Sequence, residues 1–241
     1  MPYISEAWQL KCERFLSSLE DWMEDLEPVT LQSILQEAGG PESVAFFCVD
    51  MTNGFCHEGM LQSDRVQALI NPIKELFVAA WEAGVRHFIL PQDAHPVDSP
   101  EFHDFPVHCI KGTGEAVTIP ELMSLPFSDH FIVMPKRSLS SSIGTDLDAW
   151  LDAHPEVTHR IVVGDCTDLC VYQLAMHLKL KSNALNVNQP VIVPANCVDT
   201  YDLPEDVAKD IGACAHPANL FHSLFLYHMD LNGVRIVSDI L

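Results

Sequence analysis

The sequence has 241 residues, of which 48% are hydrophobic and 20% are charged, a balance typical of a soluble globular domain with a substantial core. Its 34 acidic residues outnumber 13 basic ones and give a formal net charge of −21, which disfavours nucleic acid and anionic membranes as partners. No apolar run reaches the length of a membrane span, and the N-terminal segment lacks the apolar core of a secretory signal. We therefore expect a cytoplasmic protein that acts on a small neutral or cationic molecule.

The first predicted element is a helical arm. Residues 6–26 (EAWQLKCERFLSSLEDWMEDL) place acidic side chains on one face of a helix, and the stretch GGPES at 39–43 then interrupts the chain. We predict a separate N-terminal helical extension at residues 1–40, followed by one domain at 41–241.

After this break, short apolar runs alternate with longer segments of helical periodicity, the order typical of a parallel sheet covered by helices on both faces. The stretch MTNGFC after the first strand is not the GxGxxG turn of a dinucleotide-binding fold. We predict a three-layer α/β/α fold with a mostly parallel sheet of roughly six strands. The expected helical segments are 66–84, 145–154, 170–180 and 205–215, and the expected strands are 44–50, 86–92, 130–135, 160–164, 190–194 and 234–238.

Eight cysteines are scattered without the spacing of a disulfide framework and without a CxxC pair, so we expect free thiols. Two of them, Cys166 and Cys170, lie in the stretch GDCTDLC that follows the fourth predicted strand. Taken alone, this pair is compatible with core residues, metal ligands, a redox pair or a nucleophile.

Three predicted strands end in residues of complementary chemistry. Asp50 ends the first strand, Lys136 follows the third and Cys170 follows the fourth, and the carboxyl ends of parallel strands share one edge of a sheet. A thiol at a helix N-terminus beside a lysine is expected to have a depressed pKa, and a nearby carboxylate can act as general acid and base. Each residue also has a structural interpretation, but their joint occurrence favours a catalytic site.

The loop after the second strand is rich in possible metal ligands. Asp93 and His95 form a D-x-H pair, and Glu101 and His108 follow in the same loop. Carboxylates and imidazoles suit zinc, iron or manganese. A polar loop with ordinary surface histidines is the alternative, and the spacing alone does not decide between the two.

Several motifs in order resemble those of the isochorismatase-like cysteine hydrolases, and within that family the chain is most similar to plant-type nicotinamidases. These motifs are VDMTNGF, DAHP with a later HCIKGTG, a lysine after the third strand, GDCTDLCV and NCVDTYDLP, and together they cover about residues 44–203. Thr52, Ala94 and Cys166 depart from the residues usual in nicotinamidases and leave the amide substrate open.

The resemblance implies roles for individual residues. Asp50 corresponds to the general acid–base, Lys136 to the cationic third member and Cys170 to the nucleophile. The backbone N–H groups of Cys166 and Cys170 correspond to the oxyanion hole, with a non-proline cis peptide bond just before Cys166.

The resemblance also implies how the substrate is held. Phe55 and Phe105 match aromatic positions on either side of the substrate ring. One divalent metal ion, with zinc first and iron, manganese or magnesium as alternatives, would hold the pyridine nitrogen. Its ligands would be Asp93, His95, Glu101 and His108.

The function that follows is metal-assisted hydrolysis of nicotinamide to nicotinate and ammonia through a thioester, a step of NAD salvage. The alternatives are a related hydrolase acting on another amide, a carbamoyl group or an enol ether, and a non-catalytic ligand-binding protein. The family also leads us to expect a homo-oligomer.

Overall fold

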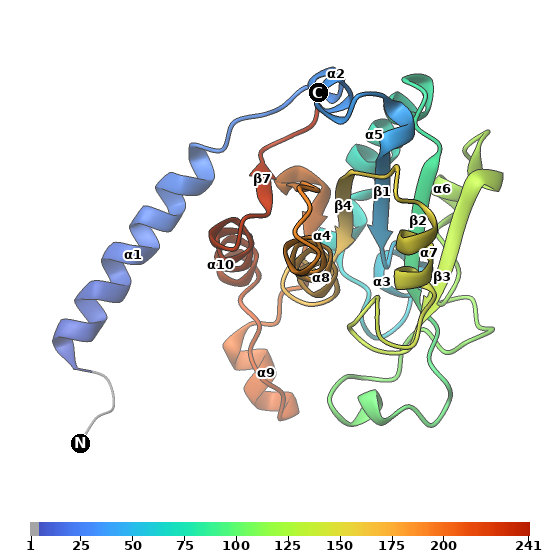
Figure 1. Ribbon diagram of the computed structural model, residues 1–241. Coiled ribbons are helices and arrows are strands. Elements are labelled where there is room, and N and C mark those ends of the chain that lie inside the picture. Colours follow the sequence, from blue (N-terminus) through green and yellow to red (C-terminus); the bar gives the residue numbers. More distant parts are fainter. Residues whose placement is uncertain (1–4) are drawn as a thin grey trace.

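A parallel sheet of seven strands forms the centre of the computed structural model, which describes residues 5–241 (Figure 1). The strands are β1 (Val44–Val49), β2 (His87–Asp93), β3 (Phe131–Lys136), β4 (His159–Asp165), β5 (Val191–Pro194), β6 (Val198–Asp199) and β7 (Arg235–Val237). Their order is β3-β2-β1-β4-β5-β7, and β6 pairs with β4. All six predicted strands are present with boundaries within one residue, whereas β6, with two residues, is too short to show a pattern.

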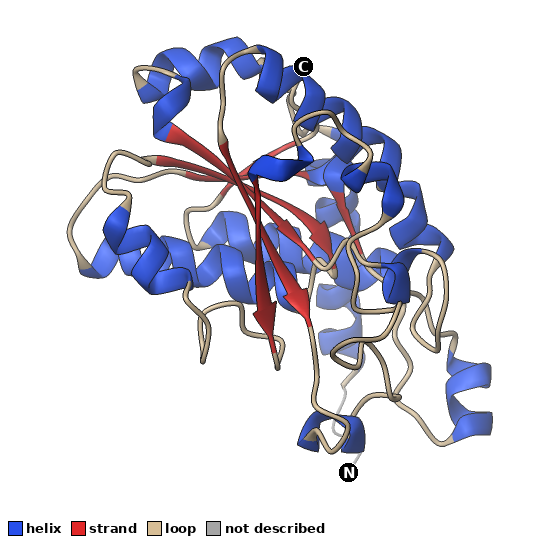
Figure 2. Ribbon diagram, turned by 90° about the vertical axis from the view of Figure 1, so that its right-hand side faces the viewer, coloured by secondary structure: helices blue, strands red, loops and turns tan. Residues whose placement is uncertain are grey.

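Helices cover both faces of the sheet, so the predicted three-layer α/β/α class is confirmed (Figure 2). No helix between residues 5 and 241 is long and apolar enough to cross a membrane. The helices are α1 (Glu6–Glu24), α2 (Leu31–Ala38), α3 (Asn53–Cys56), α4 (Asp64–Ala68), α5 (Ile70–Glu82), α6 (Pro120–Met123), α7 (Leu147–Ala153), α8 (Cys170–Ala184), α9 (Glu205–Ile211) and α10 (Ala218–Leu231).

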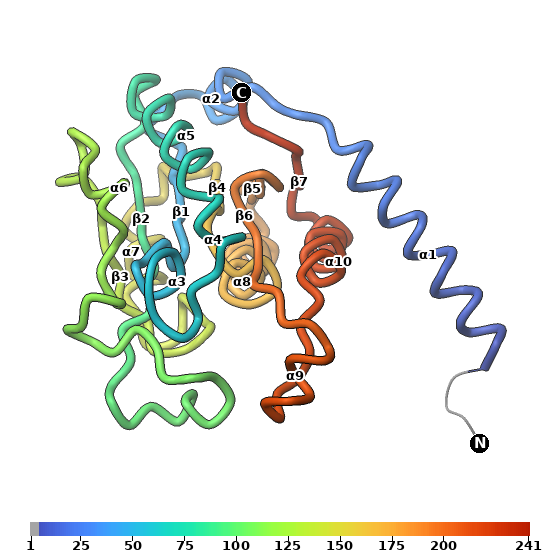
Figure 3. Tube along the Cα trace, turned by 180° about the vertical axis from the view of Figure 1, so that it is seen from behind, coloured from blue at the N-terminus to red at the C-terminus, as the bar shows by residue number. Residues whose placement is uncertain are grey.

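Two apolar cores lie on opposite faces of the sheet. On one face, Phe46 and Phe88 of adjacent strands pack with Phe77 of α5, while on the other Phe47 of β1 contacts Trp150 of α7 at 6.0 Å between ring centroids. Strands β1 and β4 are buried along their whole length, which explains their continuous apolar runs. The helices α2 and α5 border the first core, and α7, α8 and α10 border the second (Figures 1 and 3).

The strand order creates a crevice at the carboxyl end of β1. The chain runs outward from β1 through β2 to β3 and then returns to the other side of β1 to form β4. Ligands of such sheets bind where the winding direction changes, beyond the carboxyl ends of the strands. Asp50 directly follows β1 and therefore lies at this end of the sheet.

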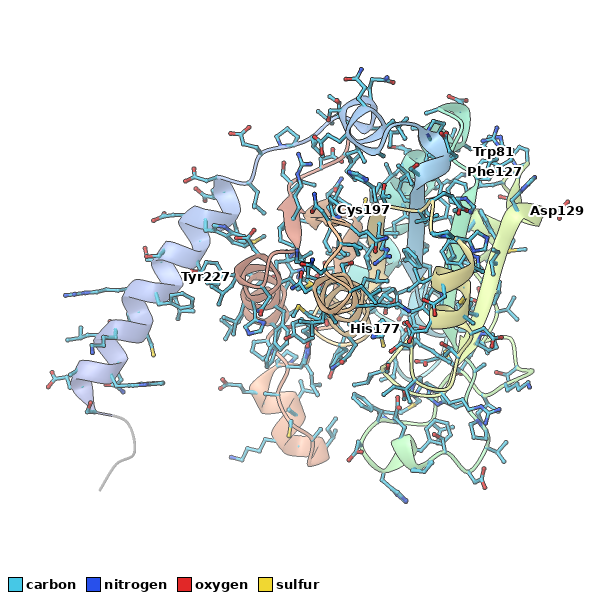
Figure 4. All side chains as sticks on the ribbon, in the orientation of Figure 1. Trp81, Phe127, Asp129, His177, Cys197 and Tyr227 are labelled. Carbon is cyan, nitrogen blue, oxygen red and sulfur yellow. The ribbon has the colours of Figure 1, made fainter. Side chains whose placement is uncertain are left out.

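Residues 1–4 of the predicted arm at 1–40 lie outside the described structure, and residues 5–40 form two parts that lie in different surroundings. Helix α1 lies apart from the sheet and contacts α10 through Tyr227, which Figure 4 shows between the two helices. The Tyr227 ring lies 5.5 Å from Phe15 and 5.2 Å from Trp22 between centroids. In contrast, α2 packs into the first of the two cores, which is the main core. Val29, just before α2, forms backbone hydrogen bonds with the C-terminal residues Asp239 and Leu241.

We expect Ile34→Ala in α2 to lower the free energy of unfolding by about 3 kcal/mol, because this side chain is fully buried in the main core. Leu16→Ala in α1 is the matched control and should change stability by less than about 0.5 kcal/mol, since Leu16 is exposed. Urea denaturation followed by circular dichroism measures both. Equal effects of the two substitutions would contradict the different packing of α1 and α2.

Candidate active site

A buried lysine joins the three predicted strand-end residues. Lys136, the last residue of β3, is fully buried, and its Nζ atom lies 2.7 Å from Asp50 Oδ2 and 2.6 Å from Asp93 Oδ1. The same ammonium donates a hydrogen bond to the Cys170 sulfur at 3.3 Å. The structure thus brings Asp50 and Cys170 together around the Lys136 ammonium.

The backbone holds Asp50 in a fixed position beside this cation. Its φ of +54° lies in the left-handed region, and its N–H donates to the carbonyl of Pro91 at 3.0 Å. The Asp93 N–H donates to Asp50 Oδ1 at 2.8 Å. One carboxylate oxygen therefore faces a backbone amide of β2 and the other faces the lysine.

The shared burial of these groups determines their protonation. Burial raises the pKa of the Asp50 carboxyl to about 6, a shift that the charge of Asp93 reinforces and that of Lys136 opposes. Burial lowers the pKa of the Lys136 ammonium, but the two carboxylates outweigh this effect and raise it well above its ordinary value. At neutral pH the site therefore contains a cationic lysine and an Asp50 that is mostly ionised.

The expectation of a depressed thiol pKa is wrong. Burial raises the pKa of Cys170 well above its ordinary value; the charge of Lys136 opposes this shift, while Asp50 and Asp93 reinforce it. The sequence showed the lysine and the helix start but not the full burial of the thiol between two carboxylates. Cys170 is therefore a neutral thiol at rest, and a base must remove its proton.

The turn between β4 and α8 carries two backbone N–H groups that could bind an oxyanion. The peptide bond between Asp165 and Cys166 is cis, as the resemblance implied, and α8 begins at Cys170. Neither the Cys166 nor the Cys170 N–H donates to another loop or turn of residues 5–241. Gly164 permits this turn, since a Cβ atom there would lie 2.0 Å from the Val49 carbonyl oxygen.

The four predicted metal ligands lie in one cluster beside Asp93. Their candidate ligand atoms all lie within 4.8 Å of one another, and three of the four residues are buried. His108 donates from Nδ1 to the Pro106 carbonyl at 2.7 Å, which leaves the lone pair of Nε2 free for a metal. The buried atoms His95 Nε2 and Glu101 Oε1 have no hydrogen-bond partner among residues 5–241. These donors and unpaired atoms fit a divalent cation.

One cavity connects the acid, the thiol and the metal cluster. Asp50 and Cys170 line it together with Asp93, Glu101 and His108 of the cluster, and it is partly open to solvent. Phe55 and Phe105 both line it, as predicted, and both rings also lie near His108, with centroids 5.6 and 6.5 Å away.

Comparison with known proteins identifies the family. The isochorismatase domain family matches residues 44–220, which is most of the chain. This protein belongs to the isochorismatase family. Nicotinamidase 1 of Arabidopsis thaliana is 32% identical over 212 residues, covering 82% of this chain and 86% of that protein.

Solved structures of two amidases share the fold. The nicotinamidase of Bacillus subtilis matches with a TM-score of 0.64 and 25% identity, over 81% of this chain and 99% of that one. The pyrazinamidase of Pyrococcus horikoshii, solved in complex with zinc, matches with a TM-score of 0.62 and 22% identity, over 81% and 98% of the two chains.

Some cavity residues were not among the predicted site residues. Tyr201 follows the two-residue strand β6, which the sequence pattern could not reveal, and Leu139 and Leu169 lie in irregular segments. Asp165, at the end of β4, also lines the cavity. Its signal was visible in the sequence, because it is another acidic residue at the end of a predicted strand.

We expect the metal-free protein to bind about one equivalent of Zn²⁺ at the four-residue cluster. His95→Ala should weaken binding by at least tenfold, because it removes a buried ligand. His103→Ala is the matched control, since this exposed histidine of the same loop is outside the cluster. Calorimetric titration with Zn²⁺ measures both, and equal affinities of the two variants would contradict the assignment.

Proposed function

We propose that this member of the isochorismatase family is a metal-assisted cysteine amidohydrolase that converts nicotinamide and water to nicotinate and ammonia, a step of NAD salvage. The observation that carries the proposal is the hydrogen bond from Lys136 to Cys170 beside Asp50, in the cavity that residues of the metal cluster also line. The identity of 32% to Nicotinamidase 1 of Arabidopsis thaliana supports the choice of substrate. The resemblance also supports assembly as a homo-oligomer, and the composition of the sequence supports a cytoplasmic location.

In the first half-reaction, Asp50 accepts the thiol proton of Cys170 while the sulfur attacks the carboxamide carbon. The negative charge that develops on the carbonyl oxygen is stabilised by the backbone N–H groups of Cys166 and Cys170. Asp50 then gives its proton to the departing nitrogen, and ammonia leaves a thioester on Cys170. Lys136 stays cationic throughout and holds the Asp50 carboxylate and the Cys170 sulfur beside each other.

In the second half-reaction, a water molecule replaces the ammonia. Asp50 accepts one proton of this water while its oxygen attacks the thioester carbon. The carbon–sulfur bond breaks, the Cys170 sulfur takes the proton back from Asp50, and nicotinate is released. Each proton that Asp50 accepts is thereby returned within the same half-reaction.

The residues that would hold the metal ion are Asp93, His95, Glu101 and His108, with zinc as our first choice. When bound, such an ion offers an open coordination position to the pyridine nitrogen and so orients the ring. Phe55 and Phe105 contact the ring from the cavity walls.

We expect the protein to release ammonia from nicotinamide and Cys170→Ala to reduce kcat by at least about a thousandfold, because no other group can form the thioester. Cys214→Ala is the matched control and should keep full activity, since this thiol is exposed and outside the cavity. A coupled ammonia assay with a panel of other amides measures both substrate and nucleophile. Hydrolysis of another amide but not nicotinamide would reassign the substrate.

We expect kcat/KM to fall as the pH decreases below about 6, because Asp50 is then protonated and cannot accept the thiol proton. A carboxyl with the ordinary pKa of about 4 would shift this fall to correspondingly lower pH. Initial rates between pH 4.5 and 8, with circular dichroism at each pH as a control for folding, test the assignment. Constant activity down to pH 5 would contradict it.

A further inference from the structure

Asp165 lines the cavity but has no part in the reaction described above. It is the last residue of β4 and only 1% exposed. Its Oδ2 atom accepts a weak hydrogen bond from the Cys166 thiol at 3.6 Å. Its Oδ1 atom is buried and has no partner among residues 5–241. A buried carboxyl oxygen of a cavity-lining residue is therefore left without a partner among residues 5–241.

Such an oxygen is unfavourable for folding, because a buried polar atom without a hydrogen bond loses its hydration and gains nothing in return. The nearby cavity walls include apolar side chains such as Phe55, Val66 and Leu169, so an apolar residue would suit the same space. Polar groups that weaken the fold in this way are expected where a ligand completes their bonding.

Asp165 lies beside the reacting groups. Gly164 pairs with Val49, so Asp165 and Asp50 follow paired positions on neighbouring strands and line the same cavity. Asp50 Oδ2 forms an ion pair with Lys136 at 2.7 Å and Asp50 Oδ1 accepts from the Asp93 N–H, whereas Asp165 Oδ1 has neither an ion-pair nor a hydrogen-bond partner among residues 5–241. Burial and the negative charge of Asp50 raise the pKa of the Asp165 carboxyl well above its ordinary value, and in either protonation state this carboxyl keeps an oxygen that can accept a hydrogen bond.

The substrate amide has a donor that the proposed mechanism leaves unpaired. A primary carboxamide carries two N–H groups, and its oxygen is bound by the backbone amides of Cys166 and Cys170. Asp50 can face only one of the two N–H groups, because its second oxygen is held by the backbone of β2. The other N–H needs a further acceptor in the cavity.

We propose that Asp165 is a specificity-determining residue, whose free carboxyl oxygen accepts the second N–H of the substrate amide and so selects primary amides over esters. This inference rests on the proposed amidohydrolase function. It assigns the amide preference to a residue of β4 that takes no part in proton transfer.

The test compares nicotinamide with methyl nicotinate, an ester of the same ring without N–H donors. Asp165→Leu should lower kcat/KM for nicotinamide about tenfold, the value of one hydrogen bond, and leave the ester within twofold. Asp165→Ala should lower the ratio of kcat/KM for the amide to kcat/KM for the ester as much as Asp165→Leu does, and it adds no side-chain volume to the cavity. Asp165→Asn keeps a carbonyl oxygen and should retain most of the preference. The Tm of Asp165→Leu should rise, because the unpaired oxygen is gone.

Thr200→Val is the matched control. Thr200 Oγ1 is also buried without a partner among residues 5–241, but the residue does not line the cavity, so its amide-to-ester ratio should equal that of the wild type. Equal losses on amide and ester in Asp165→Leu and Asp165→Ala, or an unchanged ratio, would overturn the role of Asp165 while leaving the proposed function intact. A wild-type protein without activity on nicotinamide would overturn both.

Discussion

The site depends on one buried ammonium. Lys136 Nζ contacts Asp50 at 2.7 Å, Asp93 at 2.6 Å and the Cys170 sulfur at 3.3 Å, and water does not reach it. A buried cation is tolerated only when opposite charges and hydrogen bonds compensate its lost hydration. Asp50 follows β1, Asp93 ends β2 and Cys170 begins α8. Through these three contacts, the ammonium at the end of β3 also fixes the positions of β1, β2 and α8 relative to β3. The proposed acid–base and nucleophile are positioned through the same contact.

Asp93 links this ion pair to the proposed metal cluster. Its Oδ1 atom lies close to Lys136 and 3.3 Å from His95, while its Oδ2 atom lies 3.6 Å from His108. Burial raises the pKa of Asp93, but the Lys136 charge and the two histidines outweigh it and lower the pKa below its usual range. One carboxylate thus serves both halves of the site, so the charge at the metal cluster and the charge around the thiol are coupled.

Much of the fold and of the site could be predicted from sequence because the signals were local. Strands buried on both faces have continuous apolar runs, and residues that follow parallel strands meet at one edge, so the strand pattern alone was enough to group Asp50, Lys136 and Cys170. The packing of α2 was not predicted, because its burial depends on contacts with strands and with the C-terminus far along the chain. The direction of the Cys170 pKa shift was missed for the same reason.

The sequence by itself determined which chemical groups lie at the strand ends, because the apolar pattern of a strand and the residue that follows it can both be read from a short stretch of sequence. Only the tertiary structure decided how completely those groups are buried and which of their atoms remain unpaired. The free oxygen of Asp165 is the clearest case, since its lack of a partner among residues 5–241 depends on every element around the cavity. The burial of a group and its hydrogen-bond partners depend on residues that are distant in sequence, so no local sequence pattern predicts them.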